Sequence, residues 1–261
     1  MAAIPHPNSP PAESVYLLTT LAPWAAAFGA RRCAGDDLLD ELAAFGMPAV
    51  IVDAESGART GWLELARSAR SWSVRLPAPG APDGLPPGPA AHAAGVVGEA
   101  LVVDTGAAPL LVIPQRDPDR ATGWIAHRPG GPVPPPAEMG LGEARLSLLD
   151  AIGGATAVLT GLPGASDGDA ATLRAELAAQ VSRFLPVLPP GAHARAAEVA
   201  SLAAQVLATG ALATARRASF GLAGAHSQEP DRRLAEVAAA ARAALAASVN
   251  RVIDEYTRHA V

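Results

Sequence analysis

Residues 100–127 read ALVVDTGAAPLLVIPQRDPDRATGWIAH, and this stretch decides the fold prediction. It contains three short apolar runs, at residues 100–103, 110–113 and 124–126, which are separated by Asp-Thr-Gly and Asp-Pro-Asp. Short apolar runs between turn-forming residues are typical of strands. The stretch therefore predicts a meander of three short strands.

The sequence before this meander predicts two further strands and leaves one segment undecided. Residues 49–52 form an apolar run typical of a buried strand. Trp72, Val74 and Leu76 alternate with polar residues, as in a half-buried strand. Residues 59–70 suit a helix by the spacing of their apolar residues, but a second hairpin strand is also allowed there. We keep both alternatives for this segment.

Helices are predicted over most of the remaining chain, because 62 of the 261 residues are Ala, the strongest helix former. Two Pro-rich segments, residues 77–89 and 129–136, are predicted as loops, because Pro disrupts helices and central strands. After residue 136, only residues 155–162 have the pattern of a strand. The predicted helices span residues 15–30, 38–45, 141–152, 170–185, 192–209 and about 230–258.

These elements predict an α+β fold, with a small, mainly antiparallel sheet of five or six strands in the first 130 residues. The Ala-rich helical C-terminal half is expected to pack on this sheet. We expect a mixed sheet and helix part over residues 1–136 and a helical part over residues 137–261. The strand predicted at residues 155–162 would join the sheet of the first half, so the two parts are expected to form one folded unit.

Composition excludes several classes of function. Every one of the 20 basic residues is Arg, which excludes a Walker-A phosphate loop and Schiff-base catalysis by Lys. The net charge of −5 and the scattered Arg residues disfavour nucleic-acid binding. Residues 196–215 are long enough to cross a membrane, but Glu198, Gln205 and the high Ala content favour one or two buried helices of a bundle. No membrane association is predicted.

The single cysteine, Cys33, indicates the cytoplasm. One cysteine cannot form an intramolecular disulfide, and a free thiol suits a reducing compartment. We interpret Cys33 as a small buried hydrophobic residue and not as a nucleophile.

Residues 101–107, Leu-Val-Val-Asp-Thr-Gly-Ala, carry the most specific motif of the chain. Asp-Thr-Gly after three apolar residues resembles the catalytic loop of aspartic proteases. The resemblance implies that Asp104 shares one proton with a second carboxylate, from a second copy of the motif or from a symmetric dimer. The sequence has no second Asp-Thr-Gly or Asp-Ser-Gly, and we interpret Asp104 and Gly106 as turn residues of a hairpin.

Three further side chains are candidates for chemistry. His127 ends a predicted strand beside Arg128, where an imidazole can act as a base or contact an anion. Asp167 and Asp169 lie between a predicted strand and a predicted helix, where their carboxylates could hold a hard metal cation. The alternative for this pair is a helix-capping role that needs no ligand. No cofactor is predicted, since the sequence has no Gly-x-Gly-x-x-Gly loop.

The last predicted helix carries an apolar face that must be buried against another surface. That face consists of Leu234, Val237, Ala241, Leu245, Val249, Val252 and Tyr256. We expect it to pack within the chain, and the alternative is a homodimer or a protein partner contacted through this C-terminal helix.

No set of catalytic residues stands out, so we expect a non-catalytic binding or regulatory protein of the cytoplasm. The alternative is a hydrolase-like enzyme in which Asp104, His127, Asp167 and Asp169 converge in one pocket at the strand ends.

Overall fold

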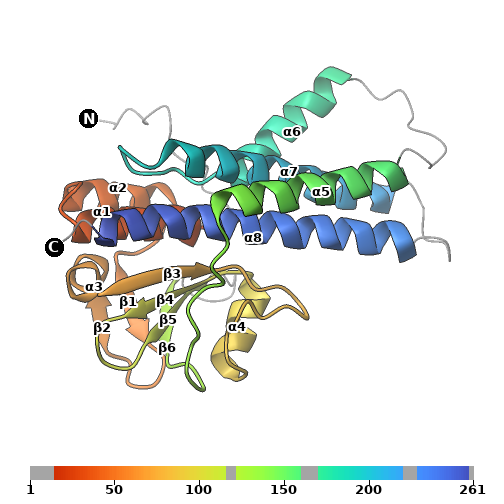
Figure 1. Ribbon diagram of the computed structural model, residues 1–261. Coiled ribbons are helices and arrows are strands. Elements are labelled where there is room, and N and C mark those ends of the chain that lie inside the picture. The colour runs from red at the N-terminus through yellow and green to blue at the C-terminus, as the bar shows by residue number, and fades with distance from the viewer. Residues whose placement is uncertain (1–14, 116–121, 160–169, 220–227, 259–261) are drawn as a thin grey trace.

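The structure is a computed structural model that describes residues 15–115, 122–159, 170–219 and 228–258. Within these residues the chain forms a six-stranded sheet with helices on both faces (Figure 1). The strands are β1 (Val50–Asp53), β2 (Arg59–Gly61), β3 (Ser71–Arg75), β4 (Ala100–Asp104), β5 (Leu110–Gln115) and β6 (Gly123–His127). The helices are α1 (Leu18–Gly29), α2 (Gly35–Ala44), α3 (Trp62–Ser68), α4 (Pro89–Val97), α5 (Leu141–Leu159), α6 (Ala170–Phe184), α7 (Ala194–Ser219) and α8 (Gln228–Arg258).

The sheet is mainly antiparallel, as the sequence predicts. In the order β2-β1-β6-β5-β4-β3, each neighbouring pair is antiparallel except β1 and β6, which run parallel. The predicted meander corresponds to β4, β5 and β6, and the two strands predicted before it correspond to β1 and β3. The predicted α+β class, with a helical C-terminal half packed on the sheet, is confirmed.

Residues 59–70 combine the two alternatives that the sequence left open. β2 occupies residues 59–61 as the hairpin partner of β1, and α3 begins directly after it at Trp62. Trp62 is fully buried, and its ring meets the ring of Trp124 in β6 edge-on, with 5.1 Å between the ring centroids. The start of α3 therefore places a large aromatic side chain in the core, against the inner face of the sheet.

Two predictions about the helical half are wrong, and one helix of the first half was missed. α5 continues through Gly153 and Gly154, where the sequence predicted its end. Residues 155–159 are therefore helical, although a strand was predicted over residues 155–162. Residues 160–162 lie outside the described part of the chain. α7 likewise continues through Gly210. Gly in a helix costs only about 1 kcal/mol relative to Ala, and the packing of α5 and α7 on α8 outweighs this cost. Finally, α4 was not predicted at all.

α8 joins the helical half to the sheet. It packs on α1, α5 and α7 and also on β3, and its buried side chains belong to the same core as those of the inner sheet face. The predicted apolar face of α8 is buried at Ala241, Leu245, Val249, Val252 and Tyr256. Among the described residues, α7 contains one stretch, Ala194–Ala215, that is long and apolar enough to cross a membrane by length and composition. Here it packs against α5, α6 and α8.

A buried carboxylate joins the N-terminal helix to the sheet. Glu99, directly before β4, is fully buried, and its Oε1 and Oε2 accept hydrogen bonds from the N–H groups of Leu17 and Leu18 at 3.0 and 2.8 Å. The first N–H groups of a helix have no partner within the helix, so Glu99 caps the start of α1. Gly98, in the left-handed conformation at the end of α4, makes the sharp turn that leads into Glu99.

Candidate functional site

The two faces of the sheet are covered to different extents. The inner face carries the main core beneath α1 and α8, whereas a smaller core lies under α4 on the outer face. α4 packs on β5, and the outer face of β1 and β6 beside it borders a groove of about 930 Å³. We call this space the α4 groove. Its size falls in the range of small-molecule sites, roughly 300–1,000 Å³.

The walls of the α4 groove are mostly apolar. Val52, Ile125 and Ile113 are register partners on the neighbouring strands β1, β6 and β5, so their side chains lie side by side on the outer face. Val96 and Val97 of α4 form the opposite wall, and Val96 is 75% exposed. An exposed aliphatic side chain beside a concave apolar surface is typical of a binding site.

One end of the α4 groove is polar, because β1 and β6 run parallel and end at the same edge of the sheet. β1 ends at Asp53 and β6 ends at His127, and both residues line the groove. Oδ1 of Asp53 accepts hydrogen bonds from the N–H groups of Glu55 and Ser56 and from the Ser56 hydroxyl, at 2.7 to 3.0 Å. The carboxyl ends of parallel strands are where α/β sheets commonly bind ligands.

The same contacts set the charges at this end of the groove. Hydrogen bonds from Ser56 and Glu55, together with the nearby Arg128, lower the pKa of Asp53 and keep it ionised. Burial lowers the pKa of His127, while the charges of Asp53 and Glu55 act in the opposite direction. His127 is therefore a neutral imidazole near pH 7, able to donate one hydrogen bond and to accept one.

Of the four side chains predicted to converge, the structure places His127 in the groove and Asp104 outside its described lining. Asp104 ends β4 at the same edge of the sheet, but β5 lies between β4 and β6. Oδ1 of Asp104 accepts a hydrogen bond from the N–H of Gly106 at 2.7 Å, as a turn residue does. Asp167 and Asp169 lie outside the described residues. In the part of the chain that is described, no group of three or more His, Cys, Asp or Glu side chains is placed to hold a metal ion.

Asp53 and the apolar walls of the groove were not predicted from the sequence. Asp53 directly follows a predicted strand, a position that by itself indicates a turn. Its importance depends on the parallel pairing of β1 with β6, which joins residues more than 70 positions apart. The missed helix α4 follows a Pro-rich loop, and Gly88 with Pro89 at its first position was the available signal for a helix start.

Comparison with known families gives two matches along the chain. Residues 18–139 match the description Rv1486c-like protein, N-terminal domain, and residues 142–246 match Rv1486c-like protein, C-terminal domain. The chain belongs to the Rv1486c-like family. Neither description states an activity or a ligand. No curated protein and no solved structure matches the chain.

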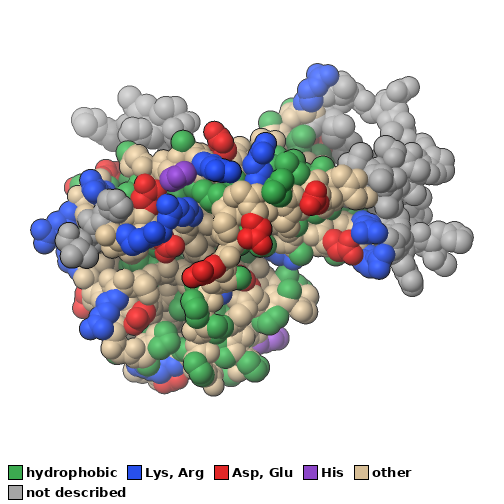
Figure 2. Space-filling model, in the orientation of Figure 1, with side chains coloured by type: hydrophobic (Ala, Val, Ile, Leu, Met, Phe, Trp, Pro, Cys, Tyr) green, Lys and Arg blue, Asp and Glu red, His purple; other side chains and the backbone are tan. Residues whose placement is uncertain are grey.

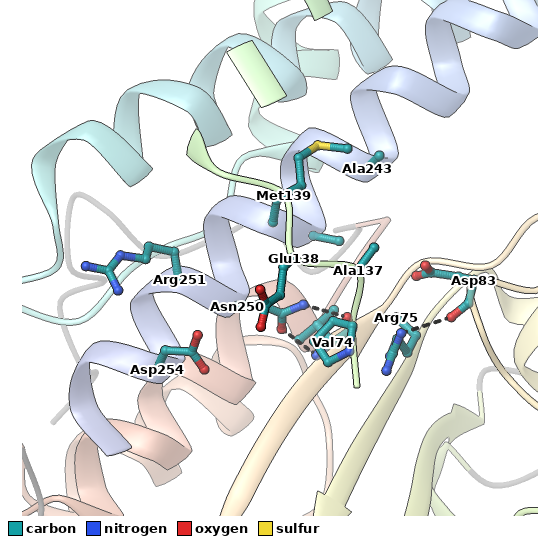
Figure 3. A pocket seen from close by; sticks show the side chains of 13 residues that line it. Val74, Arg75, Asp83, Ala137, Glu138, Met139, Ala243, Asn250, Arg251 and Asp254 are labelled. Atoms are coloured by element: carbon teal, nitrogen blue, oxygen red, sulfur yellow. Dashed lines mark hydrogen bonds between the residues drawn. The ribbon is translucent and has the colours of Figure 1, made fainter. Parts of the chain in front are cut away.

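In this Rv1486c-like chain a second, smaller cavity of about 170 Å³ lies between β3, α8 and residues 136–139 (Figure 3). Asn250 of α8 lines it, and the Asn250 carboxamide accepts a hydrogen bond from Val74 N–H at 2.7 Å and donates one to the Val74 carbonyl at 3.0 Å. Oδ2 of Asp83 accepts a hydrogen bond from Leu76 N–H at 2.7 Å. Because β3 is an edge strand, these side chains occupy backbone groups that a further strand would use. We interpret this cavity as part of the attachment of α8 to the sheet.

Proposed function

We propose that the protein is a non-catalytic binding protein whose ligand lies in the α4 groove. The observation that carries this proposal is the pair of half-buried aliphatic side chains on the outer face, Val52 and Ile125, which lie beside the buried Ile113 and opposite the exposed Val96. Removing apolar surface from water is favourable by about 25 cal/mol per Å². A ligand with an apolar body is therefore stabilised between these two walls.

The geometry supports binding better than catalysis. General acid and base groups must reach one substrate within hydrogen-bond distance. His127 faces the groove, whereas Asp104 is engaged by its own turn and is absent from the described lining. A hydrolase that uses Asp104 and His127 together therefore has less support than a binding protein.

The surface charge also favours a small ligand over a nucleic acid. On the face shown in Figure 2, Arg side chains are interspersed with acidic ones. The net charge of the whole chain is −5. Nucleic-acid binding depends on neutralising several phosphates at once, for which a gathered basic surface is needed.

The test uses Nile red, an uncharged dye whose fluorescence increases in apolar surroundings. We expect the wild-type chain to bind the dye and Val96→Glu to bind it about fivefold to tenfold more weakly, because a charge replaces one apolar wall. Val96 is 75% exposed, so the substitution leaves the core intact.

The matched control is Leu146→Glu, which places the same charge on α5 at a site that is 62% exposed and outside the described groove lining. This variant is expected to bind the dye like the wild type. Absence of binding by the wild type, or equal losses in the two variants, would reject the proposed site.

A further inference from the structure

The polar end of the α4 groove offers hydrogen-bond acceptors next to its apolar walls. Oδ1 of Asp53 is fully used by the turn that follows β1, but no described residue donates a hydrogen bond to Oδ2. His127 also lines the groove as a half-buried imidazole, and the charge of Asp53 acts on its ring. This end of the groove thus combines the negative charge of Asp53 with a ring nitrogen of His127 that can accept a hydrogen bond.

The balance of charge at this end is negative. Glu55 and Arg128, both well exposed, form an ion pair of 3.8 Å between Oε2 and Nε. Arg128 also acts on Asp53, so the two carboxylates share one positive charge and this end of the groove keeps one net negative charge. Charge complementarity therefore favours a positively charged ligand group over a neutral or anionic one.

The aliphatic side chains next to this polar end determine what kind of apolar body a ligand can have. Val52 and Ile125 lie next to this polar end, since Val52 directly precedes Asp53 and Ile125 lies two residues before His127. Val96 and Val97 close the other side. A molecule that fits has an aliphatic or aromatic body attached to its charged group.

We propose that the α4 groove binds an amphipathic amine, a small molecule with an apolar body between α4 and the outer sheet face and a protonated amino group that the charge of Asp53 attracts and that donates a hydrogen bond to His127. This inference rests on the proposed function, because it names the chemical class of the ligand for the same groove. It adds one requirement to the proposed function, namely that the positive charge of the ligand strengthens binding.

The experiment compares two ligands with the same body, 1-naphthylmethylamine and 1-naphthalenemethanol, by displacement of Nile red at low salt near pH 7. We expect the amine to bind about threefold to tenfold more tightly than the alcohol, as for a partly exposed pair of opposite charges. The preference should shrink in 0.5 M NaCl, because salt screens an accessible pair of charges.

Two variants locate the effect. Asp53→Asn keeps the acceptor oxygen of the turn and removes the charge, so we expect it to lose the preference for the amine and to bind the alcohol as the wild type does. Asp104→Asn is the matched control, because Asp104 also accepts a backbone hydrogen bond in a turn at the same edge of the sheet but lies outside the described groove lining. This control should retain the preference.

The outcomes separate the two proposals. Equal binding of amine and alcohol by the wild type, or an unchanged preference in Asp53→Asn, overturns the amine inference and leaves the groove as a site for uncharged apolar ligands. Failure of both ligands to displace the dye, or of the dye to bind, overturns the proposed function as well. Loss of the preference in Asp104→Asn as well as in Asp53→Asn overturns the assignment of the charge to Asp53.

Discussion

The protonation state of His127 determines what the polar end of the α4 groove can bind. Burial of the imidazole disfavours its charged form and lowers its pKa, and the nearby Asp53 and Glu55 offset part of this effect. A neutral His127 accepts a hydrogen bond from a cationic ligand, whereas a protonated His127 would repel it. Burial and the neighbouring carboxylates thus act on the same ring in opposite directions.

We therefore predict that His127 titrates below its ordinary value of 6.5 and that Asp53→Asn lowers its pKa further. The second shift follows because the substitution removes a negative charge that favours the imidazolium. An NMR pH titration of the ring resonances measures both values, with His127→Gln assigning the signal. Asp104→Asn should leave the titration unchanged, and a His127 pKa at or above 6.5 in the wild type would contradict the prediction.

Glu41 of α2 gives a second prediction at the scale of one residue. Burial, with a contribution from Asp40, raises the pKa of Glu41 from its ordinary 4.5 to about 7, and its Oε2 is buried without a hydrogen bond from any described residue. Between these two pH values the folded chain holds a proton that the unfolded chain has lost. The contribution of Glu41 to folding stability therefore decreases as the pH rises from about 4.5 to about 7.

Glu41→Gln should remove this loss of stability. Glu41 is only half-buried, so solvent screening reduces the effect. We expect the free energy of unfolding of the variant, relative to that of the wild type, to rise by about 1 kcal/mol from pH 5 to pH 8. Urea denaturation at the two pH values measures the difference. The exposed Glu198→Gln on α7 serves as the control and should follow the wild type. A variant that gains nothing at pH 8 would show that the carboxyl group of Glu41 is better solvated than the structure indicates.

At the scale of elements, the sequence predicted what local patterns determine. Short apolar runs between turn residues identified the meander of β4, β5 and β6, and Ala content identified most of the helices. Gly153, Gly154 and Gly210 misled the prediction because Gly ends many helices, whereas here helix packing on α8 carries α5 and α7 through them. Such tertiary packing is not visible in one sequence.

The candidate site was predictable only in part for the same reason. His127 was identified from its place at the end of a strand. Its neighbour Asp53 lies far away along the chain, and the parallel pairing of β1 with β6 brings the two together. Long-range pairing of strands depends on the whole fold, so neither the groove nor its polar end follows from local patterns.

The course of α5 through Gly153 can be tested directly. A Cβ at Gly153 would meet nothing within 4 Å, and its φ lies outside the left-handed region. Gly153→Ala should therefore stabilise the protein by about 0.5–1 kcal/mol, measured by urea denaturation. Were α5 to end at Ile152, as the sequence predicted, Gly153 would be a helix-ending residue and the same substitution would destabilise. Gly98→Ala is the contrasting control and should destabilise, because Gly98 has a φ of +86° at the end of α4.

At the scale of the molecule, the sheet and the helical half are held together by a shared core and by polar contacts at its border. The main core includes side chains from the inner sheet face and from α5, α7 and α8. Glu99 fixes α1 to the start of β4, and Asn250 fixes α8 to β3. The two predicted parts, residues 1–136 and 137–261, meet along this border. If they form one folded unit, as predicted, weakening a contact at the border should destabilise the whole molecule.

Asn250→Asp tests the attachment of α8 to the sheet. The carboxylate can still accept the hydrogen bond of Val74 N–H, but its second oxygen faces the Val74 carbonyl with no proton to donate. Asn250 is only 8% exposed, so we expect a loss of roughly 2–4 kcal/mol at pH 8, which lowers Tm by about 2–4 °C per kcal/mol. The deficit relative to the wild type should shrink at pH 5, where the protonated carboxyl group can donate to the carbonyl.

Differential scanning calorimetry of the wild type, Asn250→Asp and Ser248→Ala shows whether this loss reaches the whole molecule. Ser248 is buried on the same helix, and among the described residues its hydroxyl hydrogen-bonds only to the Leu245 carbonyl within α8, so Ser248→Ala should cost less than about 1 kcal/mol. We expect one cooperative transition in all three proteins, shifted most in Asn250→Asp, because the core is continuous across the border. If the wild type shows two separate transitions and Asn250→Asp shifts only the earlier one, the sheet and the helical half instead fold as independent domains.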